Sequence, residues 1–179
     1  MYNFKFHFSN FSDTVNDNVE INADSQRDWS DSVKVIVPSE DKTYLKVAKS
    51  INASLILESY CIKYLTATAA SERMKNEGRA SEFLSPEGSP LDLVPGVYEG
   101  GFKVWECSLD LIKYLHEANC LVNQLEVIEL GCGSGLPGLL AYHRGCDVTF
   151  QDFNKEVLEY LTIPNVILNT PDDKFAFDF

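Results

Sequence analysis

The chain has 179 residues, of which 45% are hydrophobic and 23% are charged, values typical of a globular domain accompanied by some polar sequence. Its formal net charge of -12 argues against a general nucleic-acid-binding protein, because phosphate contacts need concentrated lysine and arginine. The same charge suits contact with a basic protein, and it also serves solubility.

The cysteines and histidines form neither a disulfide framework nor a metal-ligand pattern. The five cysteines are widely spaced without a C-x-x-C pair, and the three histidines are scattered. We therefore expect a reduced intracellular protein with no metal site. The N-terminus lacks the apolar run of a signal peptide, and no segment is long enough to cross a membrane, so we expect no membrane association.

Residues 1–90 are predicted to form a largely polar, acidic and partly disordered N-terminal region. Residues 10–32 are acidic with few periodic apolar positions, which favours a mobile segment. Residues 33–37, VKVIV, predict a short strand, while the mixed apolar spacing of residues 44–64 allows a helix, a strand or one of each. Residues 71–92 contain glycine, serine, proline and charged residues and are interpreted as a linker.

Residues 91–179 are predicted to form the second region, in which helices alternate with strands. Ser108 is a plausible N-cap for the first helix, Pro137 is tolerated in the first turn of the second, and Pro164 disturbs the third. This order is typical of an open α/β sheet. The predicted elements are a helix at 108–118, a buried parallel strand at 125–130, a helix at 136–145, a strand at 147–153, a helix at 154–169 and the possible start of a third strand at 174–179.

The segment VIELGCGSGLPG, residues 127–138, joins a predicted strand to a predicted helix through Gly131, Gly133 and Gly135. Without Cβ atoms, these positions let the backbone turn sharply and approach a ligand. Asp152 ends the next predicted strand about twenty residues later, where a carboxylate can accept hydrogen bonds from ribose hydroxyls. The two features together predict a nucleoside-binding crevice. Cys132 is interpreted as a small loop residue, since no neighbour in the sequence would activate it.

Two cofactors fit this glycine pattern. Residues 133–138 match the dinucleotide pattern G-x-G-x-x-G, whereas residues 129–135 match E-x-G-x-G-x-G. Glu129 would repel a pyrophosphate but suits a ligand that carries an ammonium and a sulfonium, so electrostatics favours S-adenosylmethionine over NAD. The alternative for Glu129 is that its side chain simply points into solvent.

The stretch PGVYEGGFKVWECSLDL, residues 95–111, is too aromatic for an ordinary linker and too rich in glycine for the interior of a helix. It could be a hydrophobic strap that covers the sheet. It could also be the front wall of the cofactor crevice, with its glycines folding over the ligand.

Three segments, DLVPGVYEGGFKVWECSLDLIKYL, VIELGCGSGLPG and FQDFN, together resemble the eukaryotic protein-histidine N-methyltransferases. The resemblance implies a Rossmann-like α/β fold of the seven-strand class that uses S-adenosyl-L-methionine. The residues that it places at the cofactor are Val104, Trp105, Glu106, Cys107, Ser108, Glu129, Gly131, Cys132, Gly133, Gln151, Asp152 and Phe153.

The same resemblance implies methyl transfer to a histidine of a large-subunit ribosomal protein, nascent or chaperone-bound, in cytoplasm and nucleus. We predict no catalytic residue; Glu106 is the best base candidate, but the resemblance favours cofactor contact for it. Because the predicted strands number fewer than seven, we expect residues 91–179 to be the N-terminal half of the domain in a truncated chain. The alternatives are a catalytically inactive fragment that acts as a binding module or has no function, and a Rossmann dehydrogenase.

Overall fold

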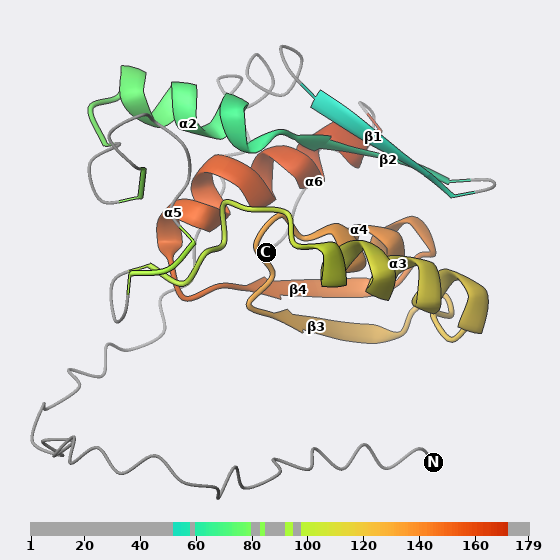
Figure 1. Ribbon diagram of the computed structural model, residues 1–179. Coiled ribbons are helices and arrows are strands. Elements are labelled where there is room, and N and C mark those ends of the chain that lie inside the picture. The colour runs from blue at the N-terminus through green and yellow to red at the C-terminus, as the bar shows by residue number, and fades with distance from the viewer. Residues whose placement is uncertain (1–51, 58–59, 80–82, 85–91, 95–97, 172–179) are drawn as a thin grey trace, which may run out of the picture. The chain divides into compact units, whose positions relative to one another are not determined.

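The computed structural model describes residues 52–57, 60–79, 83–84, 92–94 and 98–171 (Figure 1). All of them belong to one compact unit, Lys34–Phe179. The predictions of a mobile segment at 10–32, a strand at 33–37 and a third strand at 174–179 lie outside the described residues.

The first described elements are a β-hairpin and a helix. Strands β1 (Asn52–Leu57) and β2 (Tyr60–Leu65) pair antiparallel, and helix α2 (Ala67–Asn76) follows directly. Thr66 caps α2, because its hydroxyl accepts a hydrogen bond from the Ala69 N–H at 3.3 Å. The strand alternative for residues 44–64 is therefore correct from residue 52 onward. The predicted linker is wrong where it overlaps α2, whose apolar face packs into the core.

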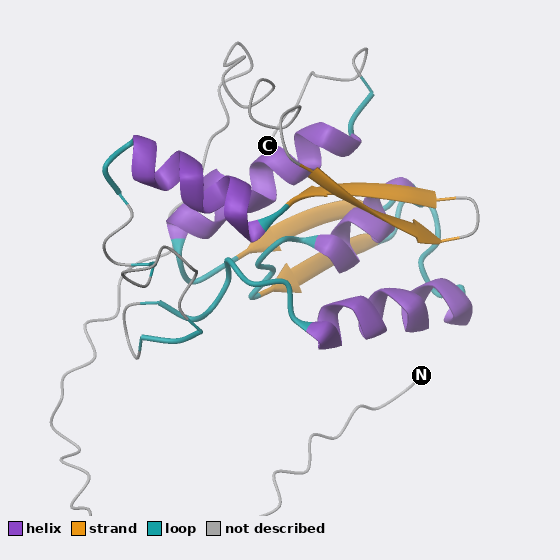
Figure 2. Cartoon of the chain, turned by 45° about the horizontal axis from the view of Figure 1, so that its top comes forward, coloured by secondary structure: helices purple, strands orange, loops and turns teal. Residues whose placement is uncertain are grey.

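The next elements follow the predicted order. They are helix α3 (Glu106–Ala118), strand β3 (Glu126–Leu130), helix α4 (Leu136–His143), strand β4 (Asp147–Gln151) and a helical segment made of α5 (Lys155–Val157), η1 (Leu158–Thr162) and α6 (Ile163–Asn169). Strands β3 and β4 pair in parallel, and they form a pair separate from the hairpin (Figure 2). A strand, a helix and a parallel strand in succession form the βαβ unit that the sequence predicts.

Two local predictions in this region are wrong. Helix α3 begins at Glu106 with Trp105 at the N-cap position, so Ser108 lies inside the first turn and is not the cap. Strand β3 is parallel as predicted but is not buried on both faces. Val127 and Glu129 face the interior, whereas Ile128 and Leu130 are 68% and 75% exposed.

The last helical segment shows how the chain accommodates Pro164. A proline cannot donate to the carbonyl four residues earlier, and its ring crowds that carbonyl. The chain forms one wider π turn, Leu158–Thr162, immediately before the helical turn that contains Pro164. The predicted disturbance of this helix is thereby confirmed.

The buried side chains form two hydrophobic clusters, and both join the hairpin region to the later elements. In the first, Leu65 and Met74 pack with Tyr98, Phe102 and residues of the last helical segment. In the second, Ile62 packs with residues of α3 and α4. A division of the chain at residue 90 therefore does not separate two packing units, since Ile62, Leu65, Met74 and Phe83 share their clusters with residues that follow residue 97.

Candidate cofactor site

The glycine loop connects β3 to α4 and contains three residues in the left-handed backbone region. Gly131, Gly133 and Gly135 have φ values of 61°, 52° and 70°. L-residues with side chains rarely adopt such angles, which explains why glycine occupies each position. A Cβ atom on Gly131 would meet nothing within 4 Å, so the space in front of this residue is open.

The carboxyl end of β4 lies against this loop. Gln151 Oε1 accepts from the Gly131 N–H at 3.2 Å, and Asp152 Oδ2 accepts from the Gly133 N–H at 2.9 Å. Asp152 Oδ1 also accepts from the Asn154 N–H at 3.1 Å. Because a carboxylate offers about four lone-pair sites, Asp152 retains capacity to accept from ligand hydroxyls. Burial raises the pKa of Asp152 above its ordinary value, and the backbone hydrogen bonds act against that rise.

Glu129 lies beneath the loop and does not point into solvent. Its Oε2 accepts from the N–H of Gly138, in the first turn of α4, at 2.8 Å. The N-cap residue of that helix is Gly135, which has no side chain, so Glu129 supplies the capping acceptor from the neighbouring strand. Burial raises the pKa of Glu129 to about 7, the Gly138 N–H opposes this rise, and the charge of Asp152 adds to it.

The segment 98–105, called the strap below, packs aromatic side chains into the core on one side and lies against the glycine loop on the other. Tyr98 and Phe102 are buried in the first hydrophobic cluster, and the Tyr98 hydroxyl oxygen accepts from the Phe102 N–H at 2.8 Å. Its glycines permit close contacts on the other side. A Cβ atom on Gly133 would lie 3.1 Å from the Gly101 carbonyl oxygen, so the strap directly touches the glycine loop.

The residues after the strap glycines lie at different depths. The Trp105 indole N–H donates to the Gly100 carbonyl at 3.1 Å, which turns the ring back onto the strap. Lys103 Nζ lies 4.7 Å from the centre of that ring, within cation–π distance. Glu106 and Cys107 are exposed at the start of α3, whereas Val104 and Ser108 are half-buried. At the end of β4, Phe153 is exposed.

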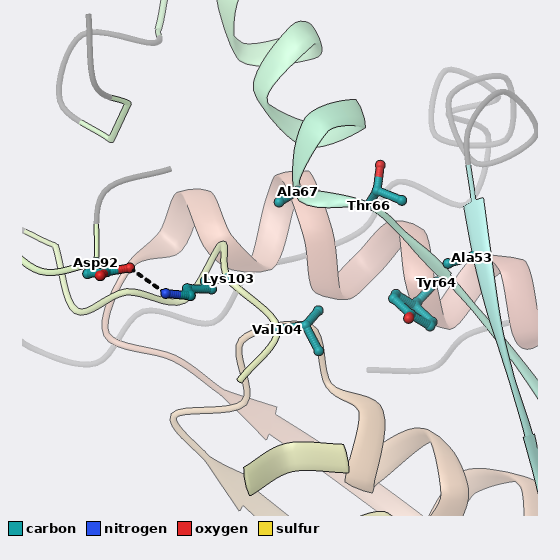
Figure 3. Close-up of a pocket in the computed structure, with 7 residues that line it drawn as sticks. All are labelled: Ala53, Tyr64, Thr66, Ala67, Asp92, Lys103 and Val104. Carbon is teal, nitrogen blue, oxygen red and sulfur yellow. Dashed lines mark hydrogen bonds and ion pairs between the residues drawn. The ribbon is translucent and has the colours of Figure 1, made fainter. Parts of the chain in front are cut away.

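A cavity of about 410 Å³ lies between the strap and the junction of β2 with α2. Figure 3 shows the Lys103–Asp92 ion pair, at 2.8 Å, on one side and Thr66 with Ala67 on the other. None of its lining residues belongs to the glycine loop, so the cavity is distinct from the contact between strap and loop. The lining residues are Ala53, Tyr64, Thr66, Ala67, Asp92, Lys103 and Val104.

Two buried residues that the sequence interpretation missed support the loop from behind. The Thr162 hydroxyl donates to the Gly133 carbonyl at 2.6 Å, and the Asn165 amide donates to the Ser134 carbonyl at 2.8 Å. Cys132 is also buried, with Sγ 3.6 Å from Thr162 Oγ1, and burial raises the pKa of its thiol to about 12. A thiol with such a pKa is a poor nucleophile at neutral pH, as expected for a loop residue.

Within the part of the chain that the structure describes, no helix is long and apolar enough to cross a membrane. The same described residues contain no group of three histidine, cysteine, aspartate or glutamate side chains that could hold a metal ion.

Comparison with known proteins relates this part of the chain to a family. Residues 95–178 match a protein family described as lysine methyltransferase. Residues 95–178 thus resemble this methyltransferase family, and the βαβ unit and the glycine loop that they contain are features of a Rossmann-like α/β fold.

The chain is also similar to proteins named histidine protein methyltransferase 1 or its homologues, which confirms the resemblance predicted from the sequence. It is 36% identical to the Bos taurus homologue over 163 residues, which cover 82% of this chain and 43% of that protein. It is 56% identical to the Dictyostelium discoideum homologue over 81 residues, or 45% of this chain and 26% of the relative. The Schizosaccharomyces pombe protein is 52% identical over 85 residues, or 44% and 25%. The chain thus spans less than half the length of these relatives.

Proposed function

We propose that the glycine loop binds S-adenosyl-L-methionine and that the protein transfers the methyl group of this cofactor to a histidine of another protein. The observation that carries the proposal is the contact of Asp152 with the N–H of Gly133 at the shared carboxyl ends of β3 and β4. In this class of sheet, nucleoside ligands bind at that edge. The open space in front of Gly131 fits a ligand that approaches the backbone closely.

Each element of the site has a separate task in this proposal. The carboxylate of Asp152 accepts hydrogen bonds from the ribose hydroxyls. Trp105, at the end of the strap, and Glu106, at the start of α3, lie against the methionine end of the ligand. The bound cofactor supplies an electrophilic methyl group on its sulfonium. The protein then has to hold a neutral imidazole nitrogen in line with that methyl, and such positioning can supply a large part of the rate enhancement. A base is needed only to keep the histidine neutral or to remove its proton afterwards.

Binding of the cofactor tests the first half of the proposal. Calorimetric titration of the full chain with S-adenosylhomocysteine should show micromolar affinity. Asp152→Ala should weaken the affinity at least about 10-fold, as expected for loss of a charged acceptor of two hydroxyls. Asp147→Ala, at the exposed start of the same strand, is the matched control and should bind normally. If the wild-type chain binds neither S-adenosylhomocysteine nor NADH, it is an inactive module. If it binds NADH instead of S-adenosylhomocysteine, it belongs with the dehydrogenases.

The nature of the accepting residue needs its own experiment. The relatives are named for histidine, whereas the matched family is described as lysine methyltransferase, so methylation of lysine is the competing possibility. The protein should be incubated with radiolabelled cofactor and a protein acceptor, and the product hydrolysed to amino acids. Label in methylhistidine supports the proposal, and label confined to methyllysine contradicts it.

We further propose that the acceptor is a large-subunit ribosomal protein, met in the cytoplasm and nucleus. The formal net charge of -12 supports a basic partner of this kind, since opposite charge accelerates encounter. We also propose that β3 and β4 are two strands of a seven-strand sheet. The exposed apolar side chains of Ile128 and Leu130 support this, because the faces of parallel sheets are normally covered.

A further inference from the structure

One face of the η1–α6 segment carries a row of three buried polar residues, Thr162, Asn165 and Asn169. Their relative exposures are 2%, 0% and 9%, and they lie among apolar residues of both hydrophobic clusters. Buried polar side chains are normally satisfied by hydrogen bonds, because an unpaired one is costly. Their partners therefore show what this helix face holds in place.

The first half of the row holds the glycine loop. Thr162 donates to the carbonyl of Gly133 and Asn165 donates to the carbonyl of Ser134, so two consecutive peptide groups are fixed from behind. In a trans peptide, the carbonyl and the following N–H point in opposite directions. The Ser134 N–H must therefore point away from the helix. These two side chains thus set the direction of the loop amides.

The second half of the row holds strand β2, which lies beside α6 (Figure 1). Asn165 Oδ1 accepts from the Leu65 N–H at 2.7 Å. Asn169 accepts from the Lys63 N–H at 3.0 Å and donates to the Lys63 carbonyl at 2.6 Å. Residues 63 and 65 are thus held at alternate positions along the strand, as a neighbouring strand would hold them.

Asn165 belongs to both halves of the row, and its single amide group joins the loop to the hairpin. Its nitrogen donates to a carbonyl and its oxygen accepts from an N–H. If the amide were reversed, both contacts would become repulsive, so only one orientation is compatible with the two partners. The hairpin therefore fixes the amide, and the amide fixes the loop. This hairpin lies outside residues 95–178, the segment that matches the methyltransferase family.

We propose that Asn165 is a positioning residue that couples the β1–β2 hairpin to the glycine loop, so that the affinity of the loop for its cofactor depends on the docked hairpin. The consequence for affinity rests on the proposed function, but the coupling itself does not. Hydrogen exchange of individual backbone amides measures the coupling without any ligand.

The variants are chosen to separate the two contacts. Asn165→Ala should speed exchange both in residues 131–135 and in β2, whereas the control Asn169→Ala should speed exchange in β2 alone. Asn165→Asp, in its ionised form, keeps the acceptor for the Leu65 N–H and loses the donor to Ser134. It should therefore speed exchange only in the loop, and it also serves if the alanine variant does not fold.

The second readout is affinity for S-adenosylhomocysteine. Asn165→Ala should raise the Kd about 5- to 30-fold, the effect of roughly one to two lost hydrogen bonds, and Asn169→Ala less than about 2-fold. Bound cofactor should also slow exchange of the Leu65 amide in the wild type but not in Asn165→Ala. The proposed coupling is contradicted if the loop amides are equally protected from hydrogen exchange in Asn165→Ala and Asn169→Ala. If the wild type binds no cofactor while the ligand-free exchange behaves as described, only the proposed function fails.

Discussion

The carboxylate of Glu129, on β3, accepts a hydrogen bond from the backbone N–H of Gly138, on α4, at 2.8 Å. This contact joins the strand before the glycine loop to the helix after it, so the loop is closed by a bond between its two flanking elements. The carboxylate is held in a buried position next to the charge of Asp152, and both circumstances oppose its ionisation.

We expect the stability of the protein to depend on the ionisation of Glu129. Burial raises the pKa of this carboxyl group from 4.5 to about 7, so the folded state binds its proton more tightly than the unfolded state. The free energy of unfolding should therefore fall as the pH rises from 4.5 through 7. Glu129→Gln can still accept from Gly138 but cannot ionise, and it should be more stable than the wild type at pH 8 by roughly 1–3 kcal/mol.

Urea unfolding of both proteins at pH 5 and pH 8 measures this difference. The stability advantage of Glu129→Gln should nearly vanish at pH 5, where both side chains are neutral. Glu126→Gln on the exposed end of the same strand is the control and should show no such pH dependence. An advantage of equal size at both pH values would show that ionisation of Glu129 is not its cause.

Gly138 should tolerate a side chain less well than Gly131 does. A Cβ atom on Gly138 would lie 2.5 Å from Glu129 Oε2 and 3.0 Å from Cζ of Phe150, so Gly138→Ala should cost about 1–3 kcal/mol through overpacking. Gly131 has open space and a positive φ, so Gly131→Ala should cost only the backbone penalty of about 1–2 kcal/mol.

Urea unfolding of the two variants at pH 5 and pH 8 separates these causes. Gly138→Ala displaces the Glu129 carboxylate and should therefore also change the pH dependence of stability. Gly131→Ala should instead lower the free energy of unfolding by the same amount at both pH values. Identical pH profiles for both variants would contradict the close contact between α4 and Glu129.

The elements from residue 106 to residue 169 could be predicted from the sequence because their signals are local. Apolar periodicity, the glycines after β3 and the prolines at 137 and 164 each act within a few residues. Such local signals do not distinguish the hairpin from a helix, because apolar residues occur on both faces of its strands. Its structure depends on packing against α4 and α6, which are more than 70 residues away.

The same distinction applies to the candidate site. The contact of Gly133 with Asp152 follows from the spacing of two parallel strands whose carboxyl ends meet at one edge. The support by Thr162 and Asn165 does not follow from spacing, because the π turn that ends at Thr162 changes the register of the helix. Similarly, the bond of Glu129 to α4 depends on how the helix packs on the strand.

We expect two side chains, Glu77 at the C-cap of α2 and Tyr160 in η1, to be energetically coupled. The Tyr160 hydroxyl donates to the Glu77 carboxylate, which also pairs with Arg73 at 3.0 Å. Burial raises the pKa of Glu77, but the hydrogen bonds from Tyr160 and Arg73 outweigh it, so the net shift is downward. The contribution of the Glu77 carboxylate to the free energy of unfolding should therefore be present above pH 4.5. It should be lost as the pH falls through the lower, folded-state pKa.

A double-mutant cycle with Tyr160→Phe and Glu77→Ala measures the coupling between the two side chains. Tyr160→Phe should lower the free energy of unfolding at pH 7 by about 1 kcal/mol, and much less once Glu77 has been replaced. Tyr114→Phe removes the same hydroxyl from an exposed ring on α3 and should have little effect. Additive effects of the two substitutions would mean that the contact contributes nothing measurable to stability.

The five cysteines should divide into two classes by their reactivity. Cys61, Cys107 and Cys120 are exposed, whereas Cys132 and Cys146 are buried, and burial raises the pKa of both buried thiols, that of Cys132 to about 12. Because the thiolate is the reacting species, brief treatment of the native protein with iodoacetamide should modify three sites and leave two unmodified.

Peptide mass spectrometry before and after unfolding in urea measures this division. The control Cys132→Ser keeps a small hydrogen-bonding group beside Thr162 and should leave the labelling of the other four cysteines unchanged. Rapid native modification of Cys132 would instead show that the glycine loop opens on the timescale of labelling, and that Thr162 does not hold it closed.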